Sequence, residues 1–443
     1  MKNIQFYDSN RIEGRAMVIV LDNGKIENIS KNYTKGAGIR ALADGSWGYT
    51  SVEGDADIQD GIQNAAGLAA GMNQKTPKEK IKLEPISNPV VRNVPAAQIN
   101  PEDISIEEKV EMLREIEKFA REEGIKNTRV SYSESILKTR YENSEGIEAE
   151  YRLVRTGFSV SAVASENGVY QMGRESKFTI SGYEIFKKYD PFALAKNAAA
   201  TAKEMLKAKT PKGGQMPVIL DQELAGVFTH EAVGHASEAD LVLQNDSVLK
   251  DRLGTQVGSP LITVVDDATV HEYGYFPFDS EGVESKRTVL IQDGVMNSYM
   301  HSRETAGIFN CCSGNARSQG YSIPVVRMSN TYIENGDTKF EEMLEDVRDG
   351  IYLVGSRGGQ VNTGEGVFQF NAEKGYMIRN GEIQELVRDV SLSGRVLEIL
   401  NQVTHVGNDL KLTAGHCGKA GQTVPVSDGA PHLSISKATV GGA

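Results

Sequence analysis

Two histidines and a glutamate lie close together in residues 229–235 of the chain. Glu231 directly follows His230, and His235 comes five residues after His230. Imidazole nitrogens are common zinc ligands, and a carboxylate beside them serves as the general base of zinc peptidases. Because the 443 residues contain only seven histidines, two of them beside one glutamate favour a metal site over two unrelated surface imidazoles.

The spacing of this motif is His-Glu-x-x-x-His, one residue longer than the usual zinc-protease form. In an ideal α-helix, positions five apart lie about 140° apart around the axis, too far to share one ion. A π-turn has this five-residue period, and single π-bulges gather at functional sites. Gly234, just before the second histidine, tolerates such a bulge or the end of the helix. The motif therefore predicts a distorted helical turn.

A catalytic zinc needs three protein ligands and an open position, so a third ligand is expected elsewhere in the chain. The candidates are the other histidines, the cysteines and two nearby carboxylates: His271, His301, His405, His416, His432, Cys311, Cys312, Cys417, Glu238 and Asp240. Cys417 lies in the glycine-rich stretch 415–422, which we interpret as a turn, and Lys419 would lower the pKa of its thiol. A lone cysteine is usually a small buried hydrophobe, but a hydrophilic, glycine-flanked loop disfavours that alternative.

The elements that position the motif can be predicted from the residues before it. Residues 216–220 form a short apolar run that is typical of a buried strand. Asp221 then caps a helix that carries Glu223 in its first turn, and Leu224 and Phe228 mark its inner face. The two histidines are thus expected on a helix that begins at the end of a buried strand.

The N-terminal half contains two blocks of strands and helices. Asn23-Gly24 and Asp44-Gly45 between β-like runs are strong hairpin signals, and Trp47 is expected in the core. The first block predicts strands at 16–21, 25–33, 37–43 and 47–52 and a helix at 55–74. The second predicts helices at 105–124 and 191–209, the first opened by a capping box of Ser105 and Glu108. It predicts strands at 128–132, 135–143, 147–155, 158–166 and 169–180. The similar order indicates a structural repeat.

The C-terminal half predicts mainly antiparallel strands. Strands are expected at 262–266 and 350–354, hairpins at 289–300 and 369–387, helices at 337–349 and 391–402, and loops at 272–281 and 355–359. The fold class is therefore α+β: an N-terminal α/β half of meanders with helices, and a C-terminal half rich in antiparallel sheet that carries the metal helix. We place a first subdomain at 1–76, a proline-rich connector at 77–101, a second subdomain at 102–211 and a β-rich domain that carries the metal motif at 212–443.

Composition excludes several classes of function. The chain has 48 basic and 60 acidic residues and a net charge of −12, which disfavours nucleic acid and anionic membranes as partners. Three cysteines in this length favour a reducing compartment over a disulfide framework. No apolar segment resembles a signal peptide or a membrane span, so we expect a cytoplasmic protein.

Several motifs together resemble the TldD/PmbA family of metalloproteases. They fall in family order over essentially the whole chain and lie at 230–235, 324–332, 406–410, 417–426 and 439–442. PmbA-like (TldE) partners lack the metal motif, and this chain keeps it, so it resembles the TldD-like type. The resemblance implies zinc ligands at His230, His235 and Cys417 and a catalytic carboxylate at Glu231, and it assigns no role to His416.

The resemblance also implies an activity and partners. We expect a zinc-dependent metallopeptidase that hydrolyses unfolded or extended polypeptides by a zinc-bound water assisted by Glu231. His271, Tyr273 and Tyr275 are candidates for an additional oxyanion donor. Family members pair as dimers, so a homodimer or a heterodimer with a PmbA-like paralogue is expected. Two alternatives remain: an amidase-like hydrolase acting on other substrates, and a non-catalytic interaction subunit.

Overall fold

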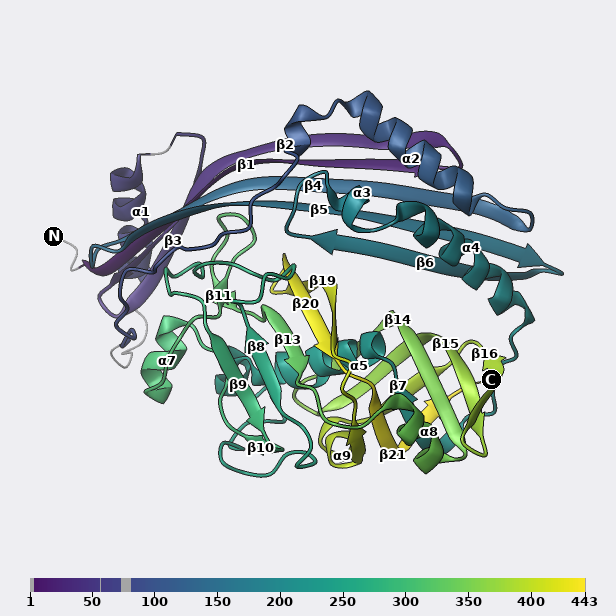
Figure 1. The fold of residues 1–443 in the computed structure, drawn as a ribbon. Helices are drawn as coiled ribbons and strands as arrows, with labels where there is room; N and C mark the ends of the chain where they lie inside the picture. The colour runs from purple at the N-terminus through teal and green to yellow at the C-terminus, as the bar shows by residue number, and fades with distance from the viewer. Residues whose placement is uncertain (1–3, 56, 73–80, 443) are drawn as a thin grey trace.

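The computed structural model describes residues 4–55, 57–72 and 81–442. Its N-terminal half is built on one six-stranded antiparallel sheet with the order β3-β2-β1-β4-β5-β6 (Figure 1). The strands are β1 (Ile4–Asp22), β2 (Lys25–Ala43), β3 (Ser46–Glu53), β4 (Ile125–Asn143), β5 (Glu148–Glu166) and β6 (Val169–Thr179). Together with the strand-rich C-terminal half, this confirms the predicted α+β class.

The two sequence blocks form the two halves of this single sheet. They join where β1 pairs with β4, with Arg15 opposite Ile136 at the centre of the pairing. In each half the second hairpin turn is an Asx-Gly pair with positive φ at both residues, Asp44-Gly45 and Asn167-Gly168. The strand order is therefore symmetric about the β1–β4 pair, as a repeat of the two blocks requires.

Strands β4 and β5 are longer than predicted, because each spans two predicted strands and the gap between them. In β5 the gap contains Gly157, which pairs with Phe178 of β6. A Cβ atom on Gly157 would lie 1.9 Å from Cδ1 of Phe178. This glycine therefore makes room for a ring within a continuous strand and does not mark a turn.

Helices cover one face of the sheet, and the other face is turned towards the C-terminal half (Figure 1). The helices of this half are α1 (Ile58–Met72), α2 (Ile106–Ala120), α3 (Ile185–Lys188) and α4 (Pro191–Lys207), with the short 3-10 helix η2 (Pro101–Asp103). Helix α2 begins with the predicted capping box of Ser105 and Glu108. It buries Leu113 and Ile116 against Ile19 of β1, so apolar packing fixes it on the sheet.

The C-terminal half contains two larger sheets. One has the order β10-β9-β8-β13-β20-β19, and the other has the order β14-β7-β21-β17-β15-β16 and is closed into a ring by pairing of β14 with β15. The strands of the first are β8 (Val264–Asp267), β9 (Arg287–Gln292), β10 (Val295–Met296), β13 (Asn330–Ile333), β19 (Lys411–Lys419) and β20 (Gln422–Ala430). Those of the second are β7 (Gly214–Leu220), β14 (Gly350–Asn362), β15 (Val367–Arg379), β16 (Glu382–Val387), β17 (Ser391–Arg395) and β21 (Leu433–Gly441).

The remaining elements connect or cover these sheets. They are α5 (Gln222–Thr229), α6 (Ala239–Leu243), α7 (Arg303–Phe309), α8 (Phe340–Val347) and α9 (Val396–Asn401), the pair β11 (Ala316–Arg317) and β12 (Val325–Val326), and β18 (Val403–Val406), which pairs with β21. Helix α5 contacts both β20 and β14, so it lies where the two larger sheets meet.

Two predictions for the closed sheet and its connections are wrong. The helix expected at 391–402 is strand β17 followed by the short helix α9. Leu392 pairs with Val440 and is fully buried, so long-range pairing decides the conformation of this segment. The loop expected at 355–359 belongs to strand β14, which has a bulge between Ser356 and Gly359.

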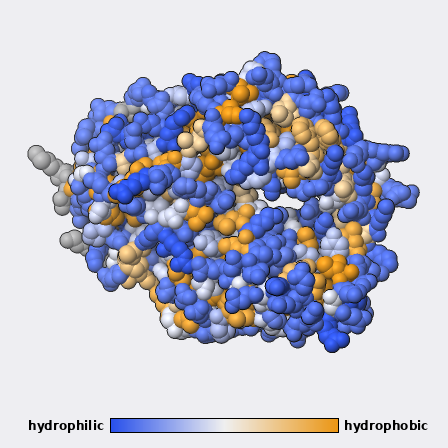
Figure 2. All heavy atoms as spheres, in the orientation of Figure 1, coloured by the Kyte–Doolittle hydropathy of each residue, from blue (hydrophilic) through white to orange (hydrophobic). Residues whose placement is uncertain are grey.

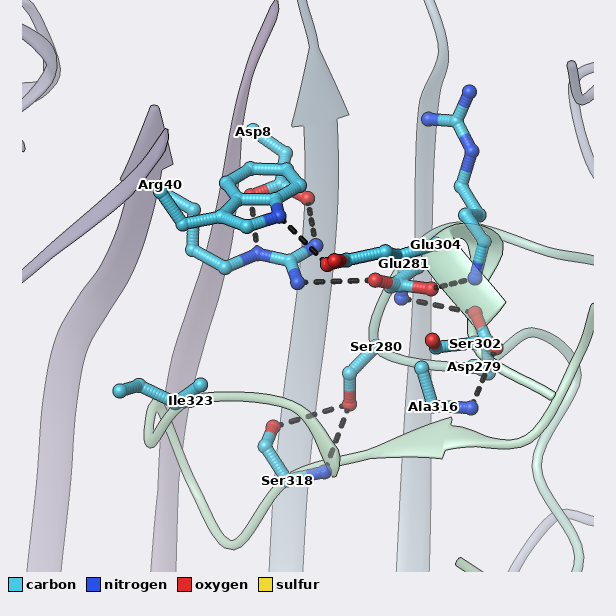
Figure 3. Close-up of polar contacts among 12 residues, drawn as sticks. Asp8, Arg40, Asp279, Ser280, Glu281, Ser302, Glu304, Ala316, Ser318 and Ile323 are labelled. Carbon is cyan, nitrogen blue, oxygen red and sulfur yellow. Dashed lines mark hydrogen bonds and ion pairs between the residues drawn. The ribbon is translucent and has the colours of Figure 1, made fainter. Parts of the chain in front are cut away.

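A buried ionic network joins the N-terminal sheet to the C-terminal half (Figure 3). Arg40 of β2 forms ion pairs with Asp8 and, at 3.0 Å, with Glu281. The second carboxylate oxygen of Glu281 accepts a hydrogen bond of 2.6 Å from the backbone N–H of Arg303. Trp47, predicted as core, is half-buried in this interface and its Nε1–H donates to Glu304 at 2.8 Å. These contacts fix the sheet over α7.

The two halves touch along only part of their length. The space-filling view shows an opening between the N-terminal sheet and the C-terminal half, towards the right of Figure 2. Among the described residues, no helix is both long and apolar enough to cross a membrane.

Candidate metal centre

The predicted distortion of the metal helix is present. Asp221 caps α5 by accepting a hydrogen bond of 2.9 Å from the N–H of Leu224. After Thr229 the helix widens into a π-turn, His230–Gly234, which the N–H of His235 closes by donating to the carbonyl of His230. The 3-10 turn η4 (His235–Ser237) follows. The extra residue of this turn brings the imidazoles of His230 and His235 to the same side of the helix.

Two glycines let this helix approach its neighbours closely. A Cβ atom on Gly234 would lie 2.0 Å from Sδ of Met328, and one on Gly226 would lie 3.0 Å from the backbone nitrogen of Gly429 in β20. Any side chain at Gly234 would therefore displace Met328 or the turn itself. Glycine here serves close packing as well as the bulge that the sequence predicted.

The structure brings His230, His235 and Cys417 together. One ligand atom from each of the three lies within 4.8 Å of the others, and Sγ of Cys417 is 3.4 Å from Nε2 of His235. The imidazole ring centroids of His230 and His235 are 5.1 Å apart. Tetrahedral zinc, with bonds of about 2.0 Å to nitrogen and about 2.3 Å to sulfur, needs ligand atoms roughly 3.3–3.8 Å apart. Two imidazoles and a thiolate therefore fit zinc in number and chemistry, and the distance between Cys417 and His235 falls within this range.

The surroundings of Cys417 differ from the prediction. The stretch 415–422 is not a glycine-rich turn: Cys417 lies within strand β19, opposite Val424 of β20, and only 2% of it is exposed. The turn is confined to Ala420 and Gly421, both with positive φ. Gly415 and Gly418 belong to the strand, so cross-strand pairing, which local composition does not reveal, determines this segment.

Comparison with known proteins gives one family over most of the chain. Models of the PmbA/TldA metallopeptidase domain 1, central domain and C-terminal domain match residues 12–72, 99–206 and 213–442, respectively. The chain belongs to the PmbA/TldD family of metallopeptidases. The resemblance predicted from the motifs is thereby confirmed.

Relatives of this PmbA/TldD-family chain match it from end to end. A metalloprotease of Archaeoglobus fulgidus is 42% identical over 99% of this chain and 100% of its own length. A zinc metalloprotease TldD homolog of Saccharolobus solfataricus is 32% identical over 94% of this chain and 91% of its own. A Thermotoga maritima protein of known crystal structure, named as a modulator of a DNA gyrase, shares the fold with a TM-score of 0.82 and 24% identity, covering 98% of this chain and 96% of that one.

The three side chains are electrostatically coupled. Burial would raise the pKa of Cys417, but hydrogen bonds with His230 and His235 outweigh it and lower that pKa to about 4. Burial would likewise lower the pKa of His235, yet Glu238 and Cys417 hold it well above its usual value. The metal-free centre thus contains a thiolate beside an imidazolium. Because zinc needs a neutral imidazole, zinc binding at this site would release protons and would strengthen as pH rises.

Two further charged residues support His235 and the thiolate strand. Glu238 is fully buried, and its Oε2 lies 3.0 Å from Nδ1 of His235 and 3.0 Å from Nζ of Lys419. Lys419 also donates to Asp240 at 2.7 Å and to the carbonyl of Val326 at 2.9 Å. Glu238, a candidate for the third ligand, is therefore a partner of His235 and of Lys419. Asp240, another candidate, is a partner of Lys419. Carboxylates bonded to the second nitrogen of a ligating histidine fix the ring and its tautomer.

Substituting Glu238 by glutamine is expected to lower zinc affinity about 10- to 100-fold, as loss of such outer partners does. The variant weakens the bond that orients His235 and removes one anionic partner of Lys419. Competition with a chromophoric chelator measures the change. Glu117→Gln, at a buried glutamate of α2, is the matched control. A folded Glu238→Gln protein with wild-type zinc affinity contradicts the prediction.

The other candidate ligands are not part of this cluster. Tyr352 and Asp409 contact His432, Thr305 contacts His301, and Tyr273 contacts His416. The rest are His271, which packs on Tyr275, His405, which lies near Asp346, and Cys311 and Cys312, which are free thiols. Among the described residues, the three-membered cluster with metal-ligating geometry is His230, His235 and Cys417.

The candidates for an oxyanion donor lie at different places. The hydroxyl of Tyr273 is 3.4 Å from Nε2 of His416, next to Cys417 in the chain, so this tyrosine reaches the hairpin that carries the thiolate. Tyr275 is buried against Leu153 and Ile180 of the N-terminal half. The predicted loop near the site is thus present, with Tyr273 as its contact to the β19–β20 hairpin.

Sequence reasoning missed two residues that shape the centre. Arg327 is completely buried and donates hydrogen bonds to the carbonyls of Cys417 and, at 3.3 Å, Gln422, so it anchors the thiolate strand. Asp428 of β20 lies on the hairpin face that carries Cys417, and burial raises its pKa to about 6 although the charge of His230 opposes this. Arg327 lies in the recognised motif 324–332, which was one available signal. Finding Asp428 requires the strand register.

Proposed function

We propose that this chain is a zinc-dependent metallopeptidase that hydrolyses peptide bonds in unfolded or extended polypeptides. The observation that carries the proposal is the convergence of His230, His235 and Cys417 at ligand spacing beside Glu231. Family membership and the zinc metalloprotease name of the Saccharolobus relative support it.

Each residue of the centre has a separate task. His230, His235 and Cys417 would hold the ion, which supplies Lewis-acid activation of water and of the substrate carbonyl. Glu231, half-buried in the π-turn, accepts the proton of the attacking water and returns it to the leaving amine. Glu238 and Lys419 keep His235 oriented while this proton moves.

An extended substrate fits the strand that carries the thiolate. Strand β19 is the last strand of its sheet order, and it lies near β6, the last strand of the N-terminal sheet. A peptide that adds to such an edge binds through its backbone, so its side chains matter little. Unfolded segments offer the required free backbone and folded proteins do not.

Zinc content combined with peptide cleavage tests the proposal. We expect close to one zinc per chain, cleavage of an unstructured peptide, loss of cleavage on chelation, and recovery on adding zinc. Cleavage of small amides with no cleavage of peptides would instead favour the amidase-like alternative. Bound zinc without any hydrolysis would favour the non-catalytic subunit.

We also propose a partner and a cellular location. We expect a homodimer or a heterodimer with a PmbA-like paralogue in the cytoplasm. Co-purification with a paralogue lacking the His-Glu-x-x-x-His motif, followed by a mass measurement of the complex, distinguishes the two assemblies.

A further inference from the structure

A cavity of about 180 Å³ lies between the N-terminal sheet and the side of the β19–β20 hairpin turned away from Cys417. Ile12, Leu137 and Leu153 line it from the sheet, and residues 423–425 line it from β20. Figure 3 shows part of its wall, where the hydroxyls of Ser280 and Ser318 are 3.0 Å apart. Because Pro425 pairs with His416 and neighbouring residues of a strand face opposite sides, Thr423 and Pro425 lie on the hairpin face opposite Cys417, whereas Val424, which also lines the cavity, pairs with Cys417.

Two buried arginines line this cavity. Arg155 is 9% exposed and donates hydrogen bonds to the carbonyls of Tyr273 at 3.2 Å and Tyr275 at 2.7 Å. Arg317 is 7% exposed and donates to the carbonyl of Pro425 at 2.6 Å and to that of Met328. Within the described part of the chain, no carboxylate lies within the 4.0 Å that defines an ion pair with either guanidinium.

The carboxylate that does line the cavity is already engaged. Asp279 accepts hydrogen bonds from the backbone N–H groups of Glu281 at 2.9 Å and Ala316 at 2.9 Å (Figure 3). It also accepts one from the N–H of Val283 at 3.0 Å. It is therefore no counter-ion for the arginines. Burial lowers the pKa of Arg155. Burial together with the charges of Arg155 and Arg327 lowers the pKa of Arg317 to about 9, although the more distant charges of Asp266 and Cys417 oppose this.

Two desolvated cations facing one space favour an anion there. A buried charge without an opposite charge is costly, and carbonyl dipoles offset only part of that cost. The planar guanidinium fork matches a carboxylate in geometry. We propose that this cavity binds a carboxylate through Arg155 and Arg317. The group belongs to a small organic acid or to the C-terminus of a peptide. This site does not depend on the proposed peptidase activity.

Thermal unfolding of the full-length chain tests this site. We measure the midpoint against sodium acetate, and against tetra-alanine with a free or an amidated C-terminus, at ionic strength held constant with chloride. Metal-free and zinc-loaded protein are both used, because acetate also coordinates zinc. We expect a saturable rise with acetate in both forms. If free tetra-alanine reaches half of its stabilising effect at a lower concentration than acetate, and the amide has no effect, the carboxylate comes from a peptide terminus. If acetate and free tetra-alanine reach half of their effects at the same concentration, it comes from a small acid.

Variants assign the effect to the two arginines. Arg155→Met and Arg317→Met are each expected to raise the concentration of acetate for half-saturation at least ten-fold. Arg152→Met, an exposed position of the same strand facing the other side, should leave it unchanged. If Arg317→Met does not fold, Arg155→Met alone decides. Absence of a saturable rise, a rise confined to zinc-loaded protein, or a rise that persists in Arg155→Met overturns the proposal.

Discussion

Replacing Glu231 by glutamine is expected to lower peptide hydrolysis by roughly 10²- to 10⁴-fold, the contribution that a positioned general base makes. Glutamine has nearly the same shape as glutamate but cannot take a proton from water. Glu231 is not among the three clustered ligand residues, so the variant should still bind one zinc ion. The measurement is kcat/KM on an unstructured peptide together with zinc content by mass spectrometry.

The control for Glu231→Gln is Glu365→Gln, which removes an exposed carboxylate far along the chain in the β14–β15 turn. It should keep the wild-type rate. Hydrolysis by the Glu231 variant at the wild-type rate, with zinc bound, would show that another group accepts the proton. Loss of both zinc and activity would show that Glu231 supports metal binding instead.

Replacing Cys417 by serine is expected to release zinc. The thiol is already ionised at neutral pH because His230 and His235 lower its pKa to about 4, whereas a serine hydroxyl stays protonated. The loss of affinity should exceed the roughly 10- to 100-fold effect of an outer partner such as Glu238, because a direct ligand is removed. Metal competition measures this loss.

Cobalt provides an independent readout of the sulfur ligand. Cobalt-substituted wild-type protein should show thiolate-to-metal charge-transfer absorption that Cys417→Ser lacks. Cys311→Ser, at a half-buried free thiol, is the matched control and should keep the band. Full zinc content and an unchanged cobalt spectrum in the Cys417 variant would identify a different third ligand.

Local signals predicted the features that depend on neighbouring residues. The five-residue spacing of His230 and His235 predicted the π-turn, because helix geometry alone sets the directions in which two side chains five residues apart point. Asp44-Gly45 predicted a hairpin turn, because positive φ favours these residue types. Ser105 and Glu108 predicted a helix start, because the side chain of each accepts a hydrogen bond from the backbone N–H of the other.

Features that depend on distant residues were missed. Cys417 is buried in a strand because Val424 and the α5 helix cover it, which local glycine content does not indicate. Leu392 is in a strand because Val440 pairs with it from nearly fifty positions later. Likewise, the contact of Lys419 with Glu238 joins elements that are separated by most of the C-terminal half.

The place of β21 has a consequence for synthesis on the ribosome. This strand follows every other described strand in the sequence, yet it lies between β7 and β17 inside the closed sheet. The ring therefore stays open until β21 has been translated. His230 and His235 are also translated long before Cys417. His230, His235 and Cys417 can therefore meet only after most of the C-terminal half has been translated.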